Sequence, residues 1–142
     1  MAKVERKPPR GIRNNNPLNI RKGSSWKGER PQQTDPAFEE FVSMEWGIRA
    51  ALKLIRNHIT GFGGSRPKMN NLCKLIGIWA PVVENDTVAY IATVCNRTGY
   101  SAFQILDPDN ETMICKIAQS MAFVECGVEL DEELFHSAWS LL

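Results

Sequence analysis

Residues 14–26 read NNNPLNIRKGSSW, and the first eight of them, Asn14 to Arg21, decide the fold. Pro17 fixes its own φ angle and disfavours a helical conformation for the residue before it, while asparagine tolerates left-handed backbone. This pattern predicts a structured turn. Beyond it, apolar Leu18 and Ile20 alternate with Asn19 and Arg21, so one face is expected to be buried. The other face would offer amides and a guanidinium to a polyhydroxylated ligand, unless the turn only connects two elements.

Apolar residues at helical spacing predict a mainly α fold around this turn. Residues 1–10 are expected to form a flexible basic arm, residues 11–142 a single domain, and residues 18–42 a small β or irregular lobe. Capping residues predict helices that begin after Ser43, after Asn70 or Asn71, at Asn85-Asp86-Thr87, after Asp107 and near Asp131. In the third of these, the residues expected to face inward are Val88, Ile91, Ala92 and Cys95.

The composition excludes several classes of function. The chain has 142 residues, 43% of them hydrophobic and 23% charged, and a net charge of +1, which argues against a general nucleic-acid binder. The charge is uneven: the chain is basic before Pro36 and acidic after Asp107. A basic surface would attract an anionic polymer such as cell-wall material, although the two ends could equally face each other.

The cysteines and histidines indicate neither a metal site nor an organic cofactor. The four cysteines have no C-x-x-C spacing and are expected to be free thiols, as in a protein folded in a reducing cytoplasm. His58 and His136 are too few for a zinc site. The sequence MAKVERKPPR does not resemble a signal peptide and no apolar run suits a membrane span. We therefore expect synthesis in a bacterial cytoplasm, no stable membrane insertion, and delivery to the cell wall by another component.

A series of short motifs resembles lysozyme-like peptidoglycan hydrolases, in particular flagellar-type glucosaminidases. There, an NN-x-x-GI turn is followed by W-x-G, a T-x-acid step and paired aromatic residues. The matching segments here are NNPLNIR (15–21), WKG (26–28), TD (34–35) and FEEF (38–41). The chain also resembles small phage proteins that carry RGIRNNNP, WAP and ENDT and are often described as virion structural proteins. The resemblance extends from Arg10 to about Gly99.

The resemblance implies a catalytic glutamic acid at the end of a helix that precedes the NN turn, and no such helix is predicted before Asn14. An apolar helix ending in Glu125-Cys126-Gly127 looks like the missing one, which implies a circular permutation. A permutation predicts that Met1 and Leu142 lie on the same side of the domain. At the margin of a core face, burial would keep Glu125 protonated for glycan cleavage. The alternative is a solvated glutamate in a last helical turn.

Glu84 is a rival acid. The segment from Pro81 to Tyr90 resembles the P-x-x-E-T-x-x-Y segment of lytic transglycosylases, with one extra residue. In that family the glutamate mostly anchors a helix start and the tyrosine hydroxyl approaches the catalytic acid. The resemblance therefore implies that Tyr90 orients Glu125, while helix capping remains the alternative for Glu84 and Asp86.

Other residues are candidates for binding and assistance. Asp35 would be a second carboxylate, or else a turn residue before Pro36. Glu39 and Glu40 are expected to face solvent and are discounted. The residues expected to line the cleft are Asn15, Asn16, Asn19 and Arg21, and Trp26 is a candidate sugar-stacking platform. Trp46, Trp79 and Trp139 are expected in the core.

These observations predict a lysozyme-like helical domain that cleaves peptidoglycan glycan strands as a muramidase, glucosaminidase or lytic transglycosylase. Such a protein would act from a phage virion, as a lysis enzyme or as a delivered toxin, with virion or secretion-system proteins as further partners. The competing interpretation is a non-catalytic virion structural or cell-wall-binding protein with the same fold, because the N-terminal acid helix is missing.

Overall fold

The structure is a computed structural model that describes residues 7–142. Residues 1–6 of the predicted arm lie outside the described residues. The prediction that Met1 and Leu142 lie on the same side of the domain therefore also falls outside them. Helices dominate the described part of the chain, in the order α1 (Arg10–Arg13), α2 (Met44–Gly64), α3 (Leu72–Trp79), α4 (Thr87–Thr98), α5 (Glu111–Cys126) and α6 (Glu132–Trp139). The mainly α fold class is confirmed.

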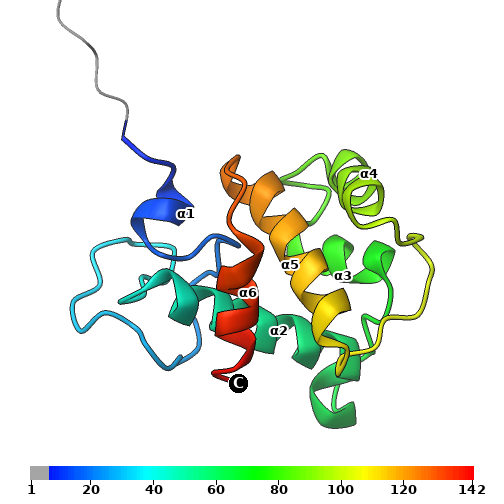
Figure 1. Cartoon of the computed structure of the whole chain (residues 1–142), viewed down its shortest axis with the longest axis horizontal. Coiled ribbons are helices and arrows are strands. Elements are labelled where there is room, and N and C mark those ends of the chain that lie inside the picture. The colour runs from blue at the N-terminus through cyan, green and yellow to red at the C-terminus, as the bar shows by residue number, and fades with distance from the viewer. Residues whose placement is uncertain (1–6) are drawn as a thin grey trace, which may run out of the picture.

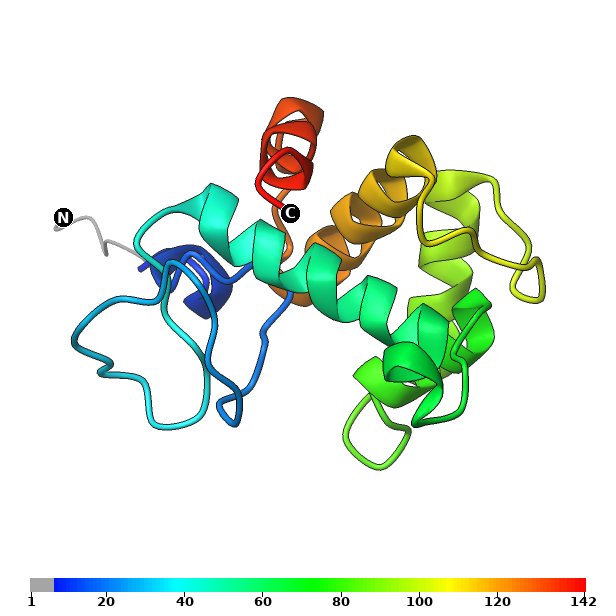
Figure 2. The ribbon, with the colours of Figure 1, turned by 90° about the horizontal axis from the view of Figure 1, so that it is seen from below.

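Helix α2 is the longest helix of the described chain and packs against α3, α5 and α6 (Figure 1). Ser43 caps its start as predicted and accepts a hydrogen bond from the Trp46 amide. Helical geometry ends at Gly61, whose φ is +68°. A side chain at Gly61 would come within 2.2 Å of the Arg66 carbonyl oxygen, so this turn requires glycine. In Figure 2, α2 runs between α1 with the irregular lobe at one end and α3 with α4 at the other.

Helix α5 fills the centre of the core between α2, α4 and α6. Its buried side chains include Ile114, Ile117 and Met121, and they pack in one cluster with apolar residues of α2 and α6 such as Ile48 and Phe135. The helix ends at Gly127 in left-handed geometry, as predicted. Burial of this apolar stripe holds Glu125, in the last turn, at a fixed position.

Two sequence-based expectations about helices are wrong, and a third holds only in part. A short helix, α1, precedes Asn14, where none was predicted. Helix α5 begins after Asn110, which caps it, because Asp107 instead accepts the Asp109 amide within a turn. In α4 the predicted inward stripe holds in part: Ile91 and Cys95 pack partly buried against the core, whereas Val88, at 76%, and Ala92 are exposed. The buried positions are Thr87, Tyr90, Val94 and Thr98.

The predicted irregular lobe is present between α1 and α2. Its extended segments form isolated bridges between Arg21 and Phe38 and between Glu29 and Phe41. Gly47 of α2 packs directly against the backbone of the asparagine turn, and a Cβ atom at Gly47 would come within 1.6 Å of the Asn15 carbonyl oxygen. This close contact holds the lobe against α2. None of the helices in the described part of the chain has the length and hydropathy needed to span a membrane.

Candidate active site

A cavity of about 420 Å³ opens where the irregular lobe meets α3, the loop before α4 and the end of α5. Its lining combines polar and apolar side chains, a composition typical of ligand sites. The lining residues are Asn19, Arg21, Phe38, Ile78, Trp79, Ala80, Pro81, Glu84, Asn85 and Glu125. Four residues predicted from the sequence as functional therefore meet in one cavity: Asn19, Arg21, Glu84 and Glu125.

Glu125 is half-buried at the inner wall of this cavity. Its carboxylate accepts the Asn19 side-chain amide on Oε1 at 3.2 Å and the Tyr90 hydroxyl on Oε2 at 3.0 Å. These partners come from the asparagine turn and from α4, so three segments distant in sequence fix one carboxyl group. Gly11 lies against Cys126, which places α1 and the asparagine turn beside the end of α5, as a permuted acid helix requires.

The surroundings of Glu125 raise its pKa. Burial raises the pKa of Glu125 above its ordinary value, and this outweighs the opposing hydrogen bonds from Asn19 and Tyr90 and the charge of Arg21. Burial and the neighbouring Glu125 also raise the pKa of Tyr90 well above its usual range, so the phenol stays a hydrogen-bond donor. A carboxyl group whose pKa is raised by burial beside a cavity is suited to general-acid catalysis.

Glu84, the rival acid, lies in the loop before α4 and has a different environment. Its side chain is 61% exposed and pairs with Arg21 Nη2 at 3.3 Å. Arg21 also stacks over the Phe38 ring at 5.2 Å. The ion pair therefore links the irregular lobe to the loop at the cavity.

The first asparagines of the turn do not line the cavity, contrary to expectation. Asn16 is fully buried; it accepts the Ile20 amide and donates to the carbonyl groups of Ile20 and Glu39. Asn15 donates to the Phe41 carbonyl and has a left-handed φ of +50°. Both side chains replace backbone hydrogen bonds that an irregular lobe cannot form, so they build the turn that presents Asn19 and Arg21.

Asp35, predicted as the second carboxylate, also lies outside the cavity lining. Its carboxylate accepts Arg10 Nε and Nη2 at 2.5 Å each, Asn14 Nδ2 at 2.9 Å, and the amides of Ala37 and Phe38. The hydrogen bonds from Arg10 hold the pKa of Asp35 far below its ordinary value. Arg10 thus belongs to the folded domain and not to a free arm. A carboxylate saturated in this way is a structural anchor, and the assignment as second catalytic carboxylate is corrected.

The expectation that Glu39 and Glu40 face solvent is wrong. Glu40 is buried and accepts the hydroxyl and amide of Thr34 and the amide of Asp35. Glu39 is also buried, and burial together with the neighbouring Glu29 raises its pKa to about 7. Alternation in a strand predicts opposite faces for successive residues, but this segment forms only isolated bridges and turns both side chains inward.

Trp46, Trp79 and Trp139 pack partly buried against the core, as predicted, but the tryptophan that lines the cavity is Trp79 and not Trp26. Trp26 packs partly buried against the core, with its Nε1 enclosed and unpaired among the described residues, and it does not line the cavity. Trp79 lines the cavity, and its Nε1 donates to the Leu18 carbonyl at 3.1 Å. The sequence signal for Trp79 was its place directly before the Pro81–Tyr90 segment that resembles transglycosylases.

Within residues 7–142, no group of three or more acidic, histidine or cysteine side chains could hold a metal ion.

Comparison with known proteins adds one relative. No protein-family model matches the sequence. The chain is 41% identical over 104 residues to Protein P5 of Pseudoalteromonas phage PM2, and the match covers 70% of this chain and 62% of the phage protein. The chain thus spans less than two thirds of the length of this relative, whose name states no activity.

Proposed function

We propose that this chain is a lysozyme-like domain of phage type that cleaves the glycan strands of peptidoglycan, with Glu125 as the general acid. The observation that carries the proposal is the network of Tyr90, Glu125 and Asn19 at the inner wall of the cavity. In this network the Glu125 carboxyl group is desolvated, its orientation is fixed by two hydrogen bonds, and the cavity beside it leaves space for a substrate. The lysozyme-like architecture and the circular permutation belong to the same proposal.

In the proposed reaction, the protonated Glu125 donates its proton to the glycosidic oxygen as the bond to the anomeric carbon breaks. The positive charge that develops on the sugar ring needs a base or nucleophile. Asp35 is held by Arg10, so either water or a hydroxyl group of the substrate would attack the anomeric carbon and pass its proton back to Glu125. Attack by water gives hydrolysis, and attack by the sugar's own hydroxyl gives the anhydro product of a transglycosylase.

Substrate recognition is proposed for the other side chains of the cavity. Asn19 and Arg21 provide donors for hydroxyl and N-acetyl groups, while Trp79 and Phe38 provide apolar faces for sugar rings. The place of action would be the bacterial cell wall, reached from a virion, during lysis or as a delivered toxin. The similarity to a phage protein supports a phage context.

The competing proposal is a non-catalytic virion structural or wall-binding protein with the same fold. It is favoured by Asp35, because the candidate second carboxylate is bound into the fold and lies outside the cavity lining. Both proposals require the cavity to bind glycan, and they differ only in whether Glu125 transfers a proton.

Release of soluble fragments from purified peptidoglycan tests the choice. We expect wild type to release fragments with new reducing or anhydro ends, Glu125→Gln to release none, and Glu84→Gln to remain active. Mass spectrometry of the ends distinguishes hydrolysis from transglycosylation. Wall binding without any cleavage by the wild-type protein would instead establish the non-catalytic alternative.

A further inference from the structure

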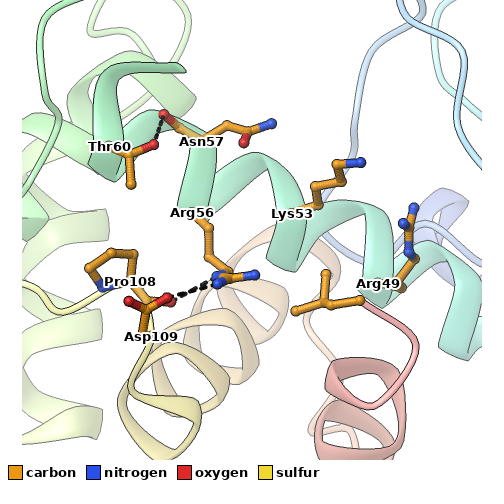
Figure 3. A pocket seen from close by; sticks show the side chains of 8 residues that line it. Arg49, Lys53, Arg56, Asn57, Thr60, Pro108 and Asp109 are labelled. Atoms are coloured by element: carbon orange, nitrogen blue, oxygen red, sulfur yellow. Dashed lines mark hydrogen bonds and ion pairs between the residues drawn. The ribbon is translucent and has the colours of Figure 1, made fainter. Parts of the chain in front are cut away.

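A second cavity, of about 300 Å³, lies along α2 and shares no lining residue with the Glu125 site (Figure 3). Arg49, Lys53 and Arg56 line it from successive turns of α2, and Pro108, Asp109 and Leu142 close it from the start of α5 and the end of the described chain. Residues at positions i, i+4 and i+7 share one helix face, so the three cations form a row about 10 Å long.

Arg56 is already compensated within the protein. Its Nη2 pairs with Asp109 Oδ1 at 2.9 Å, and its Nε donates to the Pro108 carbonyl at 2.8 Å. Its guanidinium also lies over the Trp139 ring at 5.0 Å. This arginine therefore joins α2 to the start of α5 and forms one wall of the cavity.

Arg49 is different, because it is 4% exposed and has no carboxylate partner. None of the ion pairs formed between residues 7 and 142 includes Arg49 or Lys53. The single protein hydrogen bond of the Arg49 side chain within this range is a long one, from Nε to the Leu141 carbonyl at 3.4 Å. Burying a guanidinium without acceptors is costly. Since no Arg49 nitrogen is among the fully enclosed unpaired atoms, its free N–H groups remain accessible to a ligand.

We propose that this cavity binds a phosphate monoester. The Arg49 guanidinium lies over the Trp46 ring at 6.0 Å, and neither Arg49 nor Lys53 has a carboxylate partner among the described residues. Their two positive charges match the charge of about −1.5 to −2 on a phosphate monoester better than the single charge of a carboxylate. Arginine binds two phosphate oxygens through its planar fork, and lysine adds a point charge.

The part of the cavity beyond Arg49 and Lys53 indicates what group is attached to the phosphate. Its volume exceeds that of one phosphate group, and it continues past Lys53 to Asn57 and Thr60. The Thr60 hydroxyl donates to the Asn57 backbone carbonyl, and the Asn57 side-chain amide takes part in none of the hydrogen bonds between described residues. With Pro108 and Leu142 as apolar walls, the site suits a small polar organic group attached to the phosphate.

The test is to titrate the wild-type protein with inorganic phosphate and with glycerol 3-phosphate at constant ionic strength. Binding is monitored through the chemical shifts of the backbone amides, and acetate serves as the carboxylate control. We expect saturable shifts around Lys53 and Thr60 with both phosphates, tighter binding of the ester, and no saturation with acetate. Lys53 is exposed, so Lys53→Gln should fold normally and weaken phosphate binding about tenfold. Lys74→Gln, at an exposed lysine of α3 outside the cavity, should bind as wild type.

Arg49→Lys keeps the charge and removes the fork, so it should also weaken binding; its thermal melting checks that it folds. Saturable binding at the same residues by vesicles with phosphatidic acid, and not by phosphatidylcholine vesicles, would assign the ester to a lipid, and binding of the soluble ester alone would assign it to a small molecule. Equal affinity of Lys53→Gln and wild type, or equal response to acetate, would overturn the proposal.

Discussion

Tyr90 donates its hydroxyl to Oε2 of Glu125 at 3.0 Å, and this contact joins residues 35 positions apart in the sequence. Tyr90 is buried in α4, and Glu125 is half-buried in the last turn of α5. Asn19 donates to the other carboxylate oxygen, so both oxygens are held by donors from outside α5. The carboxyl group therefore has one orientation, toward the cavity that Arg21 and Trp79 also line.

Replacing Glu125 by Gln should remove wall cleavage while the fold persists. Glutamine keeps the shape and still accepts the hydrogen bond from Tyr90 or Asn19, but it has no acidic proton to give. General-acid catalysis contributes about 10²–10⁴-fold, so fragment release should fall by that factor. The melting temperature should not fall, because a buried carboxyl group is replaced by a neutral amide. An active Glu125→Gln protein together with an inactive, folded Glu84→Gln protein would transfer the role to Glu84.

Tyr90→Phe should shift the pH dependence of cleavage. The hydrogen bond from Tyr90 lowers the pKa of Glu125, against the raising effect of burial. Without the hydroxyl, the pKa of Glu125 should rise further. Because the acid must be protonated, activity is lost as pH increases through this pKa, and the alkaline limb should move to higher pH. Tyr100→Phe is the matched control, since Tyr100 does not line the cavity and forms none of the hydrogen bonds of Glu125. If Tyr90→Phe and Tyr100→Phe lose activity at the same alkaline pH, Tyr90 does not influence the catalytic acid.

The elements that the sequence could predict are those specified by neighbouring residues. The cap at Ser43 and the glycine end at Gly127 depend on contacts within one helical turn. The closeness of Tyr90 and Glu125 was expected only through the resemblance to known enzymes. By contrast, the pair of Arg10 with Asp35 spans 25 positions across an irregular lobe, and no local pattern indicates it. The same holds for Asn16, whose partner at Glu39 is 23 positions away.

Asp35→Asn should destabilise the fold without abolishing cleavage by the folded molecules. An amide nitrogen would face the Arg10 donors, and about 2–3 kcal/mol of the free energy of unfolding should be lost at neutral pH. Because folding lowers the pKa of Asp35, this stability is present above the ordinary pKa of an aspartate and is lost as the pH falls. The difference between wild type and variant in urea denaturation should therefore shrink below about pH 4.

Asp131→Asn provides the control for Asp35. Asp131 caps α6 at an exposed position, where asparagine is an equally good cap. Asp131→Asn should therefore have the same free energy of unfolding as wild type. Loss of cleavage in Asp35→Asn, measured per folded molecule, would contradict the structural role and restore Asp35 as a catalytic candidate.

Glu39→Gln should make the protein more stable at alkaline pH. The pKa of Glu39 rises from 4.5 to about 7 on folding, chiefly through burial and then through Glu29. The folded state therefore holds a proton that the unfolded chain releases, and this contribution to stability is lost as the pH rises from 4.5 through 7. Glutamine is neutral throughout. Relative to Glu39→Gln, wild type should lose about 2–3 kcal/mol between pH 5 and pH 8 in urea denaturation, because each pKa unit corresponds to about 1.4 kcal/mol. Parallel pH profiles would show that Glu39 is ionised in the folded protein.

Trp79→Ala should weaken binding to insoluble peptidoglycan more than Trp26→Ala does. Trp79 lines the Glu125 cavity, and a sugar ring stacked on its indole would lose about 1–2 kcal/mol of binding free energy, a factor of about 5–30. Trp26 packs against the core outside that cavity, so its truncation should lower the melting temperature and spare binding by the folded protein. Pull-down affinity and thermal melting, measured on the same samples, separate the two effects.

Trp79→Phe is the control that distinguishes stacking from architecture. Phenylalanine keeps an aromatic face but loses the hydrogen bond from Nε1 to the Leu18 carbonyl, which fastens α3 to the asparagine turn. If the indole serves as a platform, Trp79→Phe should retain most of the affinity and lose about 1 kcal/mol of stability. If the indole only holds α3 in place, Phe and Ala should weaken wall binding equally. Full binding by a folded Trp79→Ala protein would place the glycan site away from this cavity.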